Sequence, residues 1–124
     1  MKLLTKAIKA AFDASVSRDG EDASKVEVIA KFFDPTGRYT FYATEAEKVE
    51  AGDSIDGKED YFLFGFCVSP LGADCDELGY VSLNELARIK GRFGLGIERD
   101  LHLPKGYTLA DAYKEYNYRY AEVA

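Results

Sequence analysis

The sequence predicts an α+β fold in which a small antiparallel sheet of three to five strands packs against two or three helices. Residues 26–44 hold two runs rich in β-branched and aromatic residues, separated by a turn sequence. Residues 61–68 form another apolar run of strand length, and apolar residues recur at helical spacing near both ends of the chain. A chain of 124 residues, 47% of them hydrophobic, is sufficient for one domain spanning residues 1–124.

The first element predicted is a helix over residues 3–15. Leu4, Ile8 and Phe12 recur at helical spacing, and Thr5 suits the N-cap position. The polar residues that follow, up to Lys25, predict a loop.

A β-hairpin is predicted next, with strands over residues 26–33 and 38–44. Between them lies Asp34-Pro35-Thr36-Gly37. Proline presets the first central position of a turn and glycine adopts positive φ, so we expect a type I turn with a glycine bulge. Both strands carry apolar residues on both faces. The hairpin is therefore expected either to be covered on both faces or to keep one aromatic face for a partner.

Residues 45–60 have low hydrophobicity and are predicted to be a connector, with a short helical turn at 45–50. The nearly continuous apolar run 61–68 is typical of a central strand that is covered on both faces.

The remaining elements are predicted from shorter signals. Tyr80-Val81 is expected to be a short strand, and Ser82 with Glu85 forms a capping box for a helix over residues 83–90. Alternation predicts a strand over residues 97–103. A last helix, capped by Thr108, carries a stripe of tyrosines.

The charge is unevenly distributed. The net charge is −6, and residues 34–77 hold three Lys or Arg against eleven Asp or Glu, a balance of −8. An acidic surface of this kind suits a partner with a basic surface. The candidate partner-binding residues are Glu45, Glu47, Glu50, Asp53, Asp56, Asp74, Asp76 and Glu77. Duplex nucleic acid is an unfavourable partner, because phosphate binding requires clustered Lys and Arg.

We expect no membrane span and no signal peptide, since no apolar run approaches the ~20 residues of a membrane helix. The two cysteines, Cys67 and Cys75, fit a reducing cytoplasm and require no disulfide. We expect Cys67 to be a core residue and Cys75 to be exposed.

A candidate polar site lies at Glu98, Arg99, Asp100 and His102, which include the only histidine. In an extended strand Glu98, Asp100 and His102 share one face and Arg99 lies on the other. A metal site needs further ligands that we cannot identify, so we expect no metal. We favour the polar face of a strand here. The alternative is a small enzyme or ligand-binding domain centred on this segment.

Other chemical signals are weak. One histidine is too few to suggest a nucleophilic triad, and the glycine-rich segment 91–96 lacks the spacing of a phosphate loop. We therefore expect no catalytic residues and no cofactor. Arg88, Lys90 and Arg92 cluster at the end of one predicted helix. They leave open a third alternative, an accessory binder of single-stranded nucleic acid.

Several segments together resemble the DUF2958 family of small bacterial proteins. They are residues 1–6, Lys31-Phe32-Phe33-Asp34-Pro35-Thr36-Gly37, Tyr42-Ala43-Thr44-Glu45, Asp60-Tyr61-Phe62-Leu63-Phe64-Gly65, residues 77–83 and residues 97–102. The resemblance implies a gene often carried on plasmids, phages or integrative elements, and it implies no catalytic residues. Together with the acidic segment it favours a non-enzymatic interaction protein that counters a host defence system by binding a basic surface on a host protein.

Overall fold

A computed structural model of the chain describes residues 2–120, with the side chain of Arg92 left out. The helices are α1 (Lys6–Ala14), α2 (Leu83–Arg88) and α3 (Leu109–Tyr120); the strands are β1 (Ala30–Phe33), β2 (Thr40–Val49), β3 (Asp60–Val68), β4 (Glu77–Ser82) and β5 (Glu98–Arg99). The strands form one antiparallel sheet in the order β4-β3-β2-β1-β5. The predicted α+β class is confirmed.

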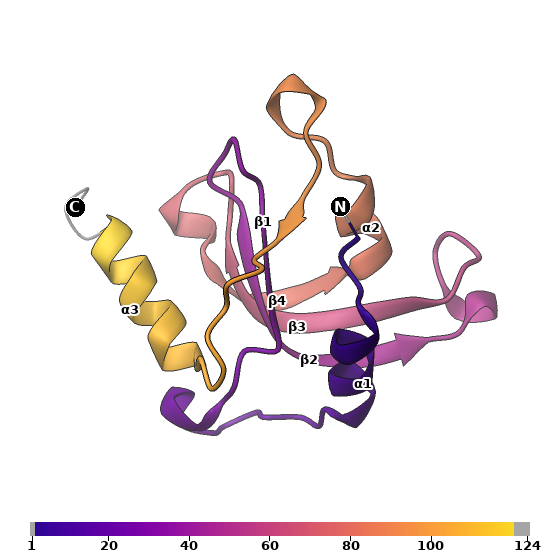
Figure 1. The fold of residues 1–124 in the computed structure, drawn as a ribbon, viewed down its shortest axis with the longest axis horizontal. Helices are drawn as coiled ribbons and strands as arrows, with labels where there is room; N and C mark the ends of the chain where they lie inside the picture. The colour runs from indigo at the N-terminus through magenta and orange to yellow at the C-terminus, as the bar shows by residue number, and fades with distance from the viewer. Residues whose placement is uncertain (1, 121–124) are drawn as a thin grey trace.

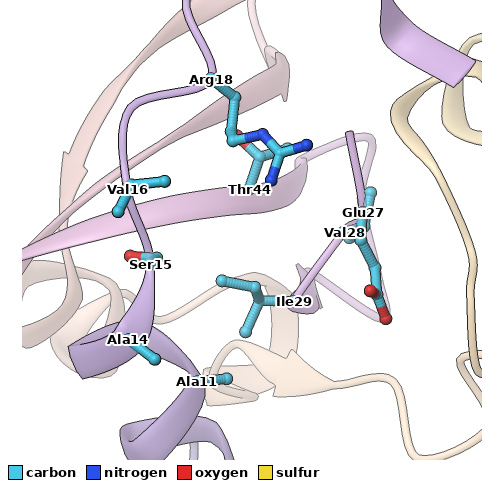
Figure 2. A pocket seen from close by; sticks show the side chains of 9 residues that line it. All are labelled: Ala11, Ala14, Ser15, Val16, Arg18, Glu27, Val28, Ile29 and Thr44. Carbon is cyan, nitrogen blue, oxygen red and sulfur yellow. The ribbon is translucent and has the colours of Figure 1, made fainter. Parts of the chain in front are cut away.

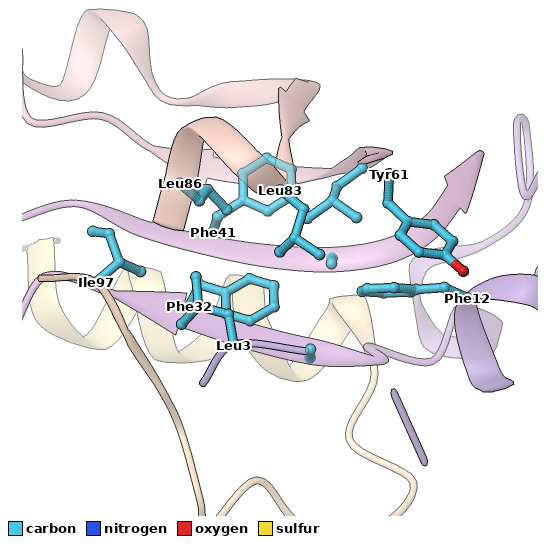
Figure 3. Packing of buried hydrophobic residues seen from close by; sticks show 11 residues of the cluster. Leu3, Phe12, Phe32, Phe41, Tyr61, Leu83, Leu86 and Ile97 are labelled. Atoms are coloured by element: carbon cyan, nitrogen blue, oxygen red, sulfur yellow. The ribbon is translucent and has the colours of Figure 1, made fainter. Parts of the chain in front are cut away.

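One face of the sheet is covered by α1 and α2. Its core includes Phe32 and Phe41 from the sheet, Phe12 from α1 and Leu86 from α2, all fully buried. Figure 3 shows these side chains in one layer, with Phe12 beside Tyr61 at one end; the two rings lie 5.6 Å apart.

The other face is covered by α3, but only in part. Phe66 of β3 is buried beneath this helix, with its ring centre 5.0 Å from that of Tyr113 and 5.3 Å from that of Tyr116. Figure 1 shows α3 at one end of the molecule and the β2–β3 hairpin extending to the other. The contacts of α3 lie at one end of β3, where Tyr113 and Tyr116 pack on Phe66 and the Tyr116 hydroxyl donates to Asp76. The helix therefore leaves the other half of the strand uncovered.

A β-bulge divides β2. Ala43 pairs with Gly65 and Glu45 pairs with Phe64, so Thr44 is an extra residue in the register, and its hydroxyl donates a 3.2 Å hydrogen bond to the carbonyl of Phe64. The pairing continues to Val49, and the expected connector and helical turn at 45–50 are therefore wrong. Pairing with the strongly apolar β3 provides hydrogen-bond partners for the backbone of this polar segment. The segment therefore forms a strand in spite of its low hydrophobicity.

The first predicted strand is shorter than expected. Only Ala30–Phe33 pairs with β2, because Val26 and Val28 form hydrogen bonds with the segment before α3. The N–H of Val28 donates to Tyr107 and that of Leu109 donates to Val26, both at 2.8 Å. The prediction for Gly37 is also wrong, since its φ is not positive. The turn is held instead by the Asp34 carboxylate, which accepts 2.8 Å hydrogen bonds from the N–H and hydroxyl of Thr36.

The strand predicted over residues 97–103 is confined to Glu98–Arg99. These two residues pair with Phe33 and Phe32, and the N–H of Asp100 donates a last 2.9 Å hydrogen bond to the carbonyl of Lys31 in β1. The chain then turns, and the carboxylate of Asp100 accepts a 2.8 Å hydrogen bond from the N–H of His102. Tyr80-Val81, by contrast, belongs to a longer strand than expected, since β4 spans six residues.

The predicted helix caps are confirmed. The side-chain oxygens of Thr5, Ser82 and Thr108 accept hydrogen bonds from the N–H groups of residues 8, 85 and 111, at 3.1, 3.2 and 3.2 Å. Within residues 2–120 there is no helix whose length and apolar character would let it cross a membrane.

Candidate functional site

The part of the sheet that α3 leaves uncovered is aromatic. Tyr80 of β4 is 70% exposed, and Phe62 of β3 is 43% exposed. The Tyr80 ring lies 5.9 Å from that of Phe62 and 4.8 Å from that of half-buried Phe64. Leu78, 45% exposed, extends the surface toward α3. Large apolar side chains gathered in this way are typical of a contact surface.

Two glutamates lie on the same face. Glu45 pairs with Phe64 and Glu47 pairs with Phe62 across the β2–β3 ladder, so each carboxylate stands beside an aromatic ring. Their neighbour Lys48 lies on the other side of β2, where its ammonium is 3.4 Å from Glu59. We call the six residues Phe62, Phe64, Leu78, Tyr80, Glu45 and Glu47 the aromatic–acidic surface.

A shallow groove of about 370 Å³ lies along this surface. Its second wall is the segment after α1, which runs along the edge of β2 beyond the end of β1. The hydroxyl of Ser15 accepts a 3.0 Å hydrogen bond from the N–H of Ala46, and the N–H of Arg18 donates to the Glu45 carboxylate at 3.1 Å. These bonds hold exposed Val16 at the rim of the groove.

The eight acidic candidates do not form one surface. Glu50, Asp53 and Asp56 lie in the loop that joins β2 to β3, whereas Asp74, Asp76 and Glu77 lie at the opposite end of β3. Asp56 accepts hydrogen bonds from the N–H of Lys58 at 3.1 Å and from Arg88 at 3.2 Å. The hydrogen bond from Lys58 is the main cause that lowers the pKa of Asp56. Together with a hydrogen bond from Ser54 and the charge of Arg88, it outweighs desolvation and holds this pKa below its usual value.

Asp76 is a structural residue. Its side chain is only 2% exposed and forms a bidentate ion pair with Arg38. It also accepts hydrogen bonds from the N–H of Ser69 at 2.7 Å and from the Tyr116 hydroxyl at 2.6 Å. Burial alone would raise its pKa, but the bonds from Arg38 and Tyr116 outweigh it and lower the pKa. This network fastens α3 to the sheet.

The Glu98–His102 segment does not converge on one site. Arg99 donates to the backbone carbonyl of Lys2. Asp100 lies 3.8 Å from the ammonium of Lys31, which itself forms a 2.8 Å ion pair with Glu115 of α3. His102 is exposed in the following turn. Arg99 and Asp100 line a shallow pocket of about 380 Å³ that Glu98 and His102 do not line. No group of three or more potential metal ligands occurs among residues 2–120.

The basic candidates lie apart from the aromatic rings. Leu83 and Leu86 direct α2 against the face of the sheet that α1 also covers, opposite to Tyr80. Arg88 of α2 is paired with Asp56, as described above, and Lys90 is exposed in the loop that follows. The predicted Arg92 contact lies outside the described side chains.

A second pocket, of about 330 Å³, lies between α1 and the segment Glu27–Ile29 (Figure 2). Ala11, Val28 and Ile29 give it an apolar lining, with Arg18 and Glu27 on different sides of the opening. The Arg18 guanidinium is engaged within its own loop, where it pairs with Glu21 and donates to the carbonyl of Lys25 at 2.9 Å. It is therefore poorly placed to receive an anion in this pocket.

The glycine-rich segment forms a loop with a strained tip. Phe93 has φ = 59° and is 91% exposed. The loop is closed by a 2.6 Å hydrogen bond from the N–H of Gly91 to the carbonyl of Leu95. A bulky residue with positive φ is uncommon, because its β-carbon meets the backbone.

Comparison with known protein families identifies the family of this chain. The model of a family described as "Protein of unknown function (DUF2958)" matches residues 3–119, nearly the whole chain. The chain belongs to the DUF2958 family. This confirms the resemblance found in the sequence and assigns no activity. Neither the curated proteins nor the solved structures yield a match.

The sequence predicted Glu45 and Glu47 as contact residues but missed their aromatic neighbours. Phe62 and Phe64 were placed in a strand covered on both faces, whereas α3 covers only its second half. The available signal was the spacing Phe62, Phe64, Phe66, which puts three rings on one face of a strand. Detecting the exposed pair would have required the position of α3 on the sheet.

Proposed function

We propose that this member of the DUF2958 family acts without catalysis, by binding another protein through the aromatic–acidic surface. The observation that carries the proposal is the exposure of Tyr80 and Phe62 beside the carboxylates of Glu45 and Glu47. Tyrosine is enriched at the centres of protein interfaces, where its ring contributes a large apolar contact area. The carboxylates at the border select a partner that presents Lys or Arg next to an apolar patch.

The cellular setting is part of the proposal. From what the family resemblance implies, we propose that the gene is carried on a plasmid, phage or integrative element, and that the partner is a host protein with a basic surface, such as a component of a defence system. The thiols of Cys67 and Cys75 are both free, which fits a reducing cytoplasm.

The two alternatives receive less support. An enzyme centred on Glu98, Arg99, Asp100 and His102 requires these groups to meet in one cavity, and they are dispersed instead. A binder of single-stranded nucleic acid requires rings beside cations, but Glu45 and Glu47 flank the exposed rings and Arg88 lies on the opposite face. Carboxylates at this position repel phosphate groups.

The test is capture of a partner from a bacterial lysate with the tagged protein and with two variants, read by mass spectrometry. We expect a protein that is retained by the parent chain and lost with the double variant Glu47→Lys and Tyr80→Ser. Asp53→Lys is the matched control, because Asp53 is exposed but lies in the β2–β3 loop. Capture should also weaken between ~50 and ~200 mM salt, because surface charges are screened. Equal capture by the parent and the double variant would contradict the proposal.

The nucleic-acid alternative has its own readout. A labelled 20-nucleotide single strand titrated with the parent protein should show no saturable binding at ~50 mM salt. Binding that falls steeply with salt and is abolished by Lys90→Glu would replace the protein partner with a nucleic acid.

A further inference from the structure

The outer edge of β4 has no neighbouring strand in the part of the chain that the structure describes. In the order β4-β3-β2-β1-β5, the two outer strands are β4, with six residues, and β5, with two. Within residues 2–120, β4 has β3 as its only neighbouring strand. Every second residue of an edge strand directs its N–H and C=O away from the sheet, so β4 presents a row of free hydrogen-bonding groups.

This edge lacks the features that usually prevent pairing with another chain. Such edges are commonly very short, bulged, or occupied by Lys or Pro. The β4 sequence Glu77-Leu78-Gly79-Tyr80-Val81-Ser82 contains neither Lys nor Pro, and it pairs with β3 in unbroken register from Glu77 to Ser82. By contrast, β5 has only two residues and is too short to pair with another chain over a long stretch.

The two faces of the edge differ in chemistry. Leu78 and Tyr80 point to the face that carries the exposed aromatic rings. Glu77 alternates with them and lies on the face of α2, whose first turn carries the exposed Glu85. An additional strand at this edge would thus meet apolar side chains on one face and carboxylates on the other.

We infer that β4 receives an extended segment of a partner protein as a sixth, antiparallel strand of the sheet, and that this segment alternates apolar and basic residues. Backbone hydrogen bonds to β4 provide its attachment. Its apolar side chains extend the layer of Leu78 and Tyr80, and its Lys or Arg side chains reach Glu77 and Glu85. This inference rests on the proposed function, because it specifies how the partner of the aromatic–acidic surface is held.

The probe for the test is a ten-residue peptide of alternating lysine and valine, acetylated and amidated at its ends, titrated into ¹⁵N-labelled protein. On binding, we expect the amides of every second β4 residue to exchange with solvent at least ten-fold more slowly. Two further peptides carry backbone N-methyl groups, one on the valines and the other on the lysines. Only one of these two sets of N–H groups faces β4, so one peptide should bind at least ten-fold more weakly than the other.

The outcomes separate this inference from the proposed function. Suppose that both methylated peptides bind equally, that the NMR signals of Phe62 and Tyr80 shift, and that no β4 amide is protected. The peptide then docks on the face of the sheet alone, so the edge inference fails and the proposed function stands. Absence of peptide binding up to millimolar concentration also overturns the inference. Protection of β4 amides that grows with protein concentration, without peptide, would identify a second copy of the chain as the occupant and overturn the partner assigned here.

Discussion

Gly65 approaches the backbone of Tyr42 so closely that a β-carbon on Gly65 would lie 1.8 Å from the Tyr42 carbonyl oxygen. The contact is made next to the β-bulge, where Gly65 pairs with Ala43 and the extra residue Thr44 follows. Glycine thus allows β2 and β3 to approach where the ladder is irregular. The same bulge sets the direction of Glu45 and Glu47, so this contact supports the candidate surface.

The variant Gly65→Ala should destabilise the protein by about 3 kcal/mol, since the added carbon overlaps backbone atoms that cannot move independently. Gly79→Ala is the matched control: Gly79 pairs directly with Gly65, and a β-carbon there would meet no atom within 4 Å. We expect the control to change the unfolding free energy by at most about 0.5 kcal/mol. Urea denaturation measures both, and equal midpoints would disprove the role of the close contact.

Asp76→Ala should cost about 3 kcal/mol of unfolding free energy, because it leaves the Arg38 guanidinium without its carboxylate in a largely buried position. The loss should appear with a loosening of α3, which the Tyr116 hydroxyl fastens to the same carboxylate. Asp74→Ala, an exposed neighbour, serves as the control and should have little effect. If both variants unfold at the same urea concentration, Asp76 is not the structural residue described here.

Acid should destabilise the folded chain. Burial by itself would raise the pKa values of Asp76 and Glu115. Hydrogen bonds from Arg38 and Tyr116 outweigh burial and lower the pKa of Asp76. Hydrogen bonds from Lys31 and Tyr107 do the same for Glu115. Their pKa values in the folded state thus lie below the unfolded values of about 3.9 and 4.3. The unfolded chain therefore binds more protons in this range, and this stabilisation, complete at higher pH, is lost as the pH falls below about 4.

Urea midpoints at pH 7, 5 and 3 measure this effect. The variant Asp76→Asn, already weaker at pH 7, should lose less stability on acidification than the parent, because one of the titrating carboxylates is gone. An identical acid dependence in both proteins would show that Asp76 does not contribute.

Phe93→Asn should raise the unfolding free energy by about 1 kcal/mol, because asparagine tolerates the left-handed conformation far better than phenylalanine. The loss of the ring should have little cost, since Phe93 is almost fully exposed. Leu95→Asn in the same loop is the control, because its φ is not positive. A thermal melt decides: a lower melting temperature for Phe93→Asn would show that the ring makes a stabilising contact.

Local signals were sufficient for much of the fold. Thr5, Ser82 and Thr108 were placed correctly as helix caps, because a cap depends on a side chain and an N–H group only three residues away. The strand at 61–68 was found from its apolar run alone. The sequence could not define the limits of β1 and β5, because these depend on which distant segment supplies the pairing partner.

The sequence by itself determined the α+β class, the helix caps, the DUF2958 membership and the excess of carboxylates in residues 34–77. Only the tertiary structure decided which carboxylates share a surface with aromatic rings. Hydrophobic periodicity predicts which side chains of a strand lie on each face of the sheet, but not how much of that face a helix covers. The bulge at Thr44 directs Glu45 and Glu47 to the side of Phe62 and Phe64, and α3 packs on Phe66 and leaves those rings uncovered.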